Sequence, residues 1–276
     1  MLCIVLYLMQ QYVHINLQFV QMEAPRLDRL TALLEGLSPK VTLATKPDGF
    51  SLHIIKAAAP SELFLDNLSA IELEGLSLLV CPVGYSSQNT LETGQKCFMS
   101  FDVVFDGPMG PSFLAEFSSP ILIGMKDADP SLLQVVTLIS NEMQASRCGQ
   151  PLFINRAGDI LLIGLMRHLT SRPLHSNGIF SALSDPRIAK SLVAIHTDPA
   201  HPWTLETLAD LAGMSRTSFA NYFKRVMQVS PGKYLENLRL AIARQLVQTG
   251  IGLKQIAAKT GYASPSTLSR ALGRST

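Results

Sequence analysis

The chain has 276 residues, with 47% hydrophobic and 16% charged, which excludes a disordered chain and predicts two packed domains. Its 18 glycines and 16 prolines follow no period, which excludes collagen-like and low-complexity structure. The net charge of +2 hides a division, because residues 1–196 carry 13 Lys or Arg against 17 Asp or Glu, whereas residues 197–276 carry ten against four. A basic region beside a mildly acidic one is typical of a polyanion-binding module joined to a regulatory or catalytic domain, although ordinary surface solvation explains it equally well.

The N-terminal residues do not have the pattern of a membrane span. The apolar run at residues 1–9 is interrupted from Gln10 onward, well short of the roughly 20 apolar residues that a membrane span needs. Residues 22–37 have the pattern of a new start, with Pro25 near a first helical turn and leucines at helical spacing after it. We therefore expect translation to start at Met22 and residues 1–21 to be an extension that is not native.

Residues 41–123 consist of short segments rich in Val, Ile, Leu and Phe, separated by turn residues. This spacing predicts an antiparallel sandwich or small barrel, with its clearest strands in residues 50–58, 70–85, 97–107 and 118–125. Residues 106–112 predict a loop in which Gly and Pro fix unusual backbone angles. After Asp129 the apolar spacing becomes helical, and residues 160–169 predict a second helix, apolar enough to require burial in the core or against a second subunit.

Catalytic or metal chemistry has little support in this first region. His53 stands alone in a strand pattern, without the neighbouring His or Glu of a metal site, so a structural histidine is expected. The signatures GxGxxG, GxxxxGK[ST], GxSxG and HExxH are absent from the sequence. We therefore expect no enzyme, no catalytic residues, no bound metal and no cofactor.

The four cysteines show no CxxC pair and no regular spacing with histidine, so neither a zinc site nor a disulfide framework is expected. Reduced thiols in the cytoplasm fit this pattern. Buried, unreactive cysteines are the favoured interpretation, and a redox sensor at Cys81 or Cys97 is the alternative. The cysteines are Cys3, Cys81, Cys97 and Cys148.

The last third of the chain has the strongest pattern. A helix is predicted to start at Ser184 or Asp185, with Pro186 in its first turn, and to end before residues 198–202. Thr204 then caps a short helix, Gly213 supplies a turn and Ser215 caps a second helix. A short helix, a tight turn with glycine and a second helix together predict a helix-turn-helix.

The second helix of this unit has an apolar and a polar side. Phe219, Phe223 and Val226 are predicted to face inward. The outer side chains can donate to base edges or phosphates, and the small alanine among them permits close approach, although a merely solvated face is the alternative. They are Arg216, Thr217, Ala220, Asn221, Lys224 and Arg225.

A second unit follows a continuous amphipathic helix predicted at residues 231–250. Gly261 turns the chain, and Ser264 and Pro265 open a helix whose outer side chains are Ser266, Ser269 and Arg270. About 16 residues of connecting helix span ~24 Å, so with the width of each unit added the two outer helices could enter successive major grooves about 34 Å apart.

The segments LADLAGMSRTSFANYFKRVMQVSPGKYLENLRLAIARQLVQTG and IAAKTGYASPSTLSRAL resemble the paired helix-turn-helix DNA-binding domain of AraC/XylS transcriptional regulators, over about residues 184–274. The acidic part of the chain is similar, more weakly, to the cupin-like domain with which these proteins sense an effector or dimerise. The resemblance implies an α+β chain, with a cupin-like antiparallel β-barrel and flanking helices at residues 22–175 and an all-α double helix-turn-helix domain at residues 184–276.

The resemblance also implies which side chains contact DNA. Base contacts are implied for Arg216, Thr217, Ala220 and Asn221 in the first unit and for Pro265, Ser266, Ser269 and Arg270 in the second. With Lys224, Arg225 and Ser264, these residues form the candidate DNA-binding set.

The partners implied by the resemblance are double-stranded DNA, RNA polymerase, a small-molecule effector and a second copy of the chain, with no membrane. Family members usually continue past the second recognition helix with another turn and a closing helix, whereas this chain stops at residues 271–276. We therefore expect the second unit to be the less stable one. The alternatives are a cupin-like enzyme fused to a helical domain, a module that binds only proteins, and a truncated regulator with weak DNA binding.

Overall fold

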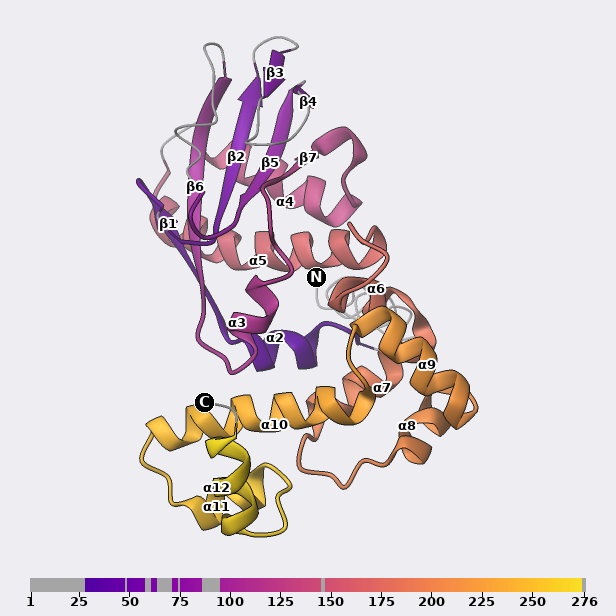
Figure 1. Cartoon of the computed structure of the whole chain (residues 1–276). Helices are drawn as coiled ribbons and strands as arrows, with labels where there is room; N and C mark the ends of the chain where they lie inside the picture. The colour runs from indigo at the N-terminus through magenta and orange to yellow at the C-terminus, as the bar shows by residue number, and fades with distance from the viewer. Residues whose placement is uncertain are drawn as a thin grey trace, which may run out of the picture.

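The computed structural model describes residues 28–47, 49–57, 61–63, 71–73, 75–85, 95–144 and 147–274 (Figure 1). The predicted start at Met22, the extension before it and Cys3 lie outside the described residues. None of the described helices has both the length and the apolar character needed to cross a membrane.

An antiparallel sheet forms the first domain, as predicted (Figure 1). Residues at the centre of the sheet, such as Leu52, Ile54 and Leu78, are fully buried, and β2 has five consecutive buried residues because both of its faces are covered. The strand order is β1 (Pro39–Ala44), β6 (Gln95–Phe105), β2 (Ser51–Ala57), β5 (Leu76–Cys81) and β7 (Ile121–Gly124), while β3 (Ser61–Leu63) pairs with β4 (Ile71–Leu73).

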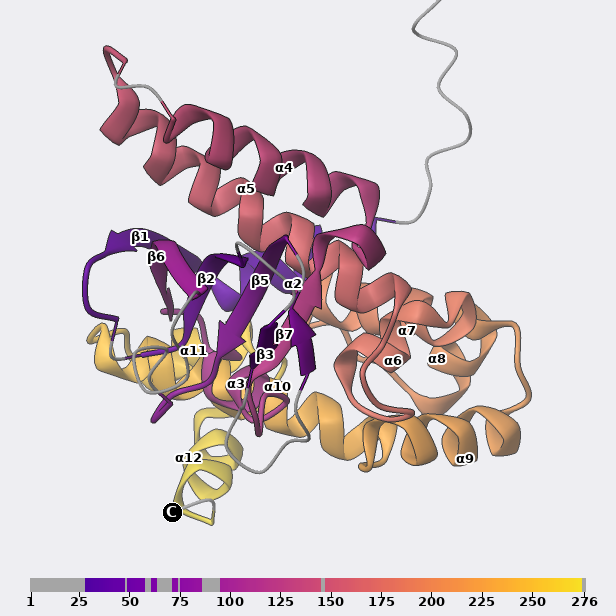
Figure 2. The same cartoon turned by 90° about the horizontal axis from the view of Figure 1, so that it is seen from above.

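Two long helices, α4 (Pro130–Glu142) and α5 (Gln150–Ser171), run side by side along the sheet (Figure 2). The Asp129 side chain accepts a hydrogen bond from the Ser131 amide and caps α4. Gly158 lets α5 approach the sheet, since a Cβ there would lie 2.8 Å from Val41 Cγ1. Both helices confirm the change to helical spacing, but Ile160, 48% exposed, does not reach the core of this chain, so the predicted burial of that segment holds only on one side.

Two local predictions are wrong. Residues 110–112 begin the helix α3 (Gly110–Leu114) instead of a loop, and Gly107 keeps a negative φ. Glycine is needed at position 107 for space, because a Cβ there would lie 2.1 Å from the Gly36 carbonyl oxygen. The helix expected from the region of Pro25 starts, in its described part, only at α2 (Thr31–Leu37), after the Asp28 carboxylate accepts hydrogen bonds from the amides of Leu30 and Thr31.

The remaining helices follow the predicted order. Asp185 caps α7 and Pro186 occupies its first turn. In both views α8 and α9 lie at one end of α10, and α11 and α12 lie at the other (Figures 1 and 2). The helices are α6 (Ile179–Ser184), α7 (Pro186–Thr197), α8 (Leu205–Ala212), α9 (Arg216–Met227), α10 (Pro231–Gln248), α11 (Leu253–Lys259) and α12 (Pro265–Gly273).

A continuous apolar core joins the sheet to the first helix-turn-helix unit. Phe113 on α3 connects the sheet domain to α6, since its ring centroid lies 5.3 Å from that of Phe117 and 5.7 Å from that of Phe180. Immediately before α6, Gly178 donates through its amide to the Val226 carbonyl oxygen of α9 at 2.8 Å. Helix α6 therefore fixes the first unit against the sheet domain.

Buried His53 and half-buried His196 make the stability of this core depend on pH. Burial lowers the pKa of His53 to about 4, and burial also lowers the pKa of His196, whose Nε2 lies 2.7 Å from the Tyr234 hydroxyl oxygen, to about 4. Since an unfolded histidine has a pKa near 6.5, the unfolded state binds more protons between about pH 6.5 and pH 4.

The contribution of the two histidines to the free energy of unfolding should therefore be fully present above about pH 6.5. It should fall as the pH drops toward 4, by up to about 3 kcal/mol for each histidine. Urea unfolding at a series of pH values measures this slope. His196→Gln should remove part of it, whereas His201→Gln, at an exposed position, should leave it unchanged. An identical slope in the His196→Gln variant would contradict the assignment.

Candidate nucleic-acid interface

The first helix-turn-helix unit is held by local hydrogen bonds, as predicted. The Thr204 hydroxyl oxygen accepts from the Thr207 amide at 3.1 Å, and the Thr207 hydroxyl oxygen accepts from the Thr204 amide at 3.0 Å. Gly213 adopts a φ of 65°, which a glycine reaches without strain, and Ser215 caps α9. These bonds fix the turn between α8 and α9.

The inner side of α9 anchors the helix. Phe219 and Phe223 are fully buried, with ring centroids 5.6 Å apart, and Phe223 also contacts Tyr234 of α10 at 5.8 Å. The six predicted contact residues of this unit lie on α9. All are exposed except Ala220, which is half-buried, and the set is Arg216, Thr217, Ala220, Asn221, Lys224 and Arg225.

The second unit repeats the arrangement on a smaller core. Gly261 has a φ of 71° and also lies against the segment before α8, since a Cβ there would lie 2.5 Å from the Ala200 carbonyl oxygen. Arg239 of α10 reinforces this contact by donating to the carbonyl oxygens of Pro199 and His201 at 2.8 and 2.7 Å. The loop before the first unit therefore braces the second.

The five candidate residues of the second unit do not all have the same role in the structure. Ser264 caps α12, accepting from the Thr267 amide at 3.2 Å. Its hydroxyl therefore has a structural task, whether or not it also meets DNA. The other four, Pro265, Ser266, Ser269 and Arg270, are exposed on α12.

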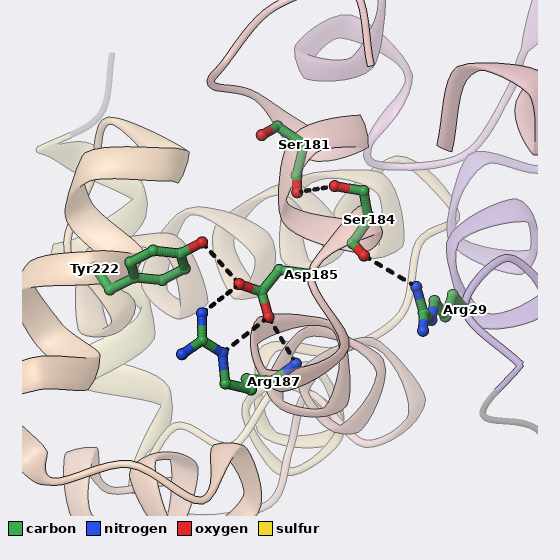
Figure 3. Close-up of polar contacts among 6 residues, drawn as sticks. All are labelled: Arg29, Ser181, Ser184, Asp185, Arg187 and Tyr222. Carbon is green, nitrogen blue, oxygen red and sulfur yellow. Dashed lines mark hydrogen bonds and ion pairs between the residues drawn. The ribbon is translucent and has the colours of Figure 1, made fainter. Parts of the chain in front are cut away.

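Sequence reasoning missed a polar cluster beside α9 (Figure 3). Asp185, at the start of α7, accepts from the Tyr222 hydroxyl at 2.7 Å and from Arg187 Nη2 at 2.8 Å. The Arg187 and Tyr222 hydrogen bonds hold the pKa of the Asp185 carboxyl well below its usual range. Arg187 and Arg225 both lie over the Tyr222 ring. The Asp185–Tyr222 bond joins residues 37 positions apart, so periodicity gives no signal for it.

On the other side of the same junction, the sheet domain contacts α6. Arg29 Nη1 donates to the Ser184 carbonyl oxygen at 3.2 Å (Figure 3). It also donates to the Leu183 carbonyl oxygen at 2.9 Å, and these are the last two carbonyls of α6. Far along α10, Gln245 Nε2 donates to the Asp106 carbonyl oxygen at 2.9 Å. The helices that carry both units are therefore bonded to the sheet domain at two separate places.

Cys81 and His53 fit the structural interpretation, whereas the prediction of buried cysteines is wrong for Cys148. Cys81 is buried, and burial raises its pKa to about 12. Cys97 is half-buried beside the Ser100 hydroxyl, and Cys148 is exposed. His53 is buried between the hydroxyls of Ser51 and Ser100, as a structural histidine should be. No group of three or more His, Cys, Asp or Glu that could hold a metal occurs among the described residues.

Comparison with known proteins gives two family matches. Residues 208–276 match a helix-turn-helix domain model and residues 68–171 match a cupin model. The fold and the interface thus define a protein with a cupin domain and a double helix-turn-helix domain. These two domains occur together in the order that the resemblance to AraC/XylS regulators implies, so that resemblance is confirmed.

Curated relatives agree with this assignment. The HTH-type transcriptional regulator AlkR of Acinetobacter baylyi is 34% identical over 173 residues, covering 61% of this chain and 56% of AlkR. A putative AraC-like transcription regulator of Streptomyces lividans is 36% identical over 141 residues, covering 50% of this chain and 46% of the relative. The chain spans about half the length of the curated relatives it matches.

Among solved structures, the DNA-binding domain of AdpA in complex with a target DNA is similar to part of the chain. It is 27% identical, with a TM-score of 0.31, and the match covers 33% of this chain and 81% of that domain.

The sizes of the two cores predict unequal protection of the two units. The first unit shares the large core of the sheet domain, whereas the buried residues of the second form a separate cluster of Ala243, Ile256, Ala257 and Leu268. We expect amide hydrogen exchange to be faster in residues 253–272 than in residues 205–228, because fewer buried contacts oppose local opening. Equal protection of the two segments would contradict this.

Proposed function

We propose that the chain is a sequence-specific DNA-binding transcription regulator that acts in the cytoplasm, with its reading domain at residues 184–276 and a sensing domain at residues 22–175. The observation that carries the proposal is the placement of two exposed polar helix faces, on α9 and α12, at the two ends of one helix. The 18 residues of α10 span ~27 Å. With the width of a unit at each end, this length suits reading helices in successive major grooves about 34 Å apart.

Contacts with phosphates would supply affinity, and contacts with base edges would supply sequence choice. Lys224, Arg216 and Arg270 are exposed cations that would displace counterions from phosphates, which makes affinity depend on salt. Asn221 lies one turn beyond Thr217 on α9, so both side chains project from the same side of the helix toward base edges. An asparagine amide pairs best with adenine, through one donor and one acceptor.

The sheet domain would act as the sensor. A small molecule bound there changes DNA affinity only if it binds the DNA-competent arrangement with a different affinity from the others. Three sets of contacts would transmit such a difference. They are the Arg29 bonds to α6, the Gln245 bond from α10 to Asp106, and the ring contacts of Phe180. Each joins the sheet domain to a helix that positions a reading unit.

RNA polymerase and a second copy of the chain are the proposed protein partners. The support for a homodimer is the set of apolar side chains that α4 and α5 leave exposed, with exposed fractions of 46% for Leu138, 65% for Leu152 and 48% for Ile160. A role in regulation, rather than a cupin-like enzyme, is supported by the relatives, which are named as transcriptional regulators.

Selection of binding sites from a pool of random duplexes, with the full-length protein at a stated salt concentration, tests the proposal. The wild-type protein should enrich one sequence, and Asn221→Ala should lose about 1–3 kcal/mol at a single base pair of it because a bidentate contact is removed. Asn237→Ala, at an exposed position of α10 away from both reading helices, is the matched control and should keep the wild-type preference.

Two results would count against the proposal. Enrichment of no sequence by the wild-type protein would favour a protein-binding module or a regulator with weak DNA binding. An unchanged preference in Asn221→Ala would remove this residue from the reading role while leaving the regulator itself in place.

A further inference from the structure

A polar cluster joins α7 to the first helix-turn-helix unit. Asp185 and Arg187 lie at the start of α7, outside both units, whereas Tyr222 and Arg225 lie on α9. Asp185 is a nearly buried hub, with only 14% of its side chain exposed. Its Oδ1 accepts from the Arg187 amide at 2.9 Å and from Arg187 Nε at 3.1 Å, and its Oδ2 accepts from Arg187 Nη2 and from the Tyr222 hydroxyl (Figure 3). One carboxylate thereby fixes a side chain of α7 to a side chain of α9.

Two guanidinium groups contact the Tyr222 ring. Arg187 Cζ lies 5.1 Å from the ring centroid and Arg225 Cζ lies 4.6 Å from it, both within range of a cation–π interaction. Arg225 is one turn after Tyr222 on α9 and next to Lys224 on the exposed side of that helix. Arg187 therefore extends the basic surface of α9 onto a different helix.

The cluster is both cationic and preorganised. Its one carboxylate faces two arginines, with Lys224 beside them, so positive charge is in excess. Arg187 is bonded to Asp185 through Nε and Nη2, yet 54% of its side chain is exposed, so the guanidinium can still accept a second anion. A free surface arginine loses rotamer entropy when it binds, whereas Arg187 is already ordered by three hydrogen bonds to Asp185 from its backbone and side chain.

We propose that this cluster is a third DNA contact, at which Arg187 and Arg225 grip a backbone phosphate beside the major groove that α9 enters. The inference rests on the proposed DNA binding and deepens it by adding a contact from α7. Arginine suits this task because its planar fork bonds phosphate oxygens in pairs. Phosphate contacts fix the register and orientation of a protein on the duplex without reading sequence. The Tyr222 hydroxyl, bonded to Asp185, is a positioning group that holds the arginines at one place on the flank of α9.

The test is the salt dependence of DNA binding by the full-length protein, measured on the duplex enriched by selection and on an unrelated duplex. Arg187→Gln should weaken binding to both duplexes by the same factor, roughly tenfold or more, because a charge-assisted hydrogen bond to phosphate is lost and no base is read. It should also reduce the slope of log K against log salt concentration by about 1. Arg187→Lys keeps the charge and should keep the slope, while losing part of the affinity.

Controls separate this contact from general effects of charge and folding. Arg156→Gln removes an exposed arginine of α5 that pairs with Asp159 in the sheet domain, and it should change neither the slope nor the affinity. Tyr222→Phe keeps the ring and removes the bond to Asp185, so it should weaken binding to both duplexes less than Arg187→Gln does. Thermal unfolding checks that each variant is folded.

An unchanged salt slope in Arg187→Gln, with normal enrichment by the wild-type protein, would overturn the third contact and leave the proposed function standing. A loss confined to the enriched duplex would also overturn it, because it would make Arg187 a base-reading residue. Absence of any duplex preference in the wild-type protein would overturn the proposed function, and the third contact with it.

Discussion

Helix α10 is the constraint on which the rest of the molecule depends. Its buried residues are shared between two cores, since Leu235 and Leu238 lie in the large core and Ala243 lies in the small one. A single helix thus fixes both the distance and the rotation between α9 and α12, because a continuous hydrogen-bonded helix transmits both. Flexibility in this element would leave two independent units that each bind weakly, whereas rigidity makes them one reading surface.

The attachment of the sheet domain gives the reading surface its connection to a sensor. The two units are attached to the sheet domain unequally. The first shares its core, whereas the end of α10 that carries the second is held by the polar contact of Gln245. The sheet domain is therefore joined to α6 by a large apolar contact and to the far end of α10 by a smaller, polar one. The second unit, with its small core, is the part of the reading surface that such a change can displace at the lower cost in free energy.

Much of this architecture could be predicted from sequence because local interactions determine it. Thr204, Gly213 and Ser215 act through bonds to residues at most five positions away, so their meaning is visible in a short window. The role of Gly107 could not be predicted, because the atoms that require a glycine belong to Gly36 and Leu37 in another element. The Asp185–Tyr222 bond was missed for the same reason. Asp185 was visible as a helix cap, but its second partner is set by how α7 packs against α9.

The phase of the two half-sites tests the central claim most directly. We would measure the affinity of the full-length protein for the selected duplex after inserting five or ten base pairs between the half-sites. Because a rigid α10 holds both reading helices on one face of the duplex, five added base pairs, about half a helical turn, should reduce binding to that of a single half-site. The same loss should follow from ten added pairs, which restore the face but exceed the reach of the helix. Equal affinity for all three duplexes would show that the units move independently and would contradict the account.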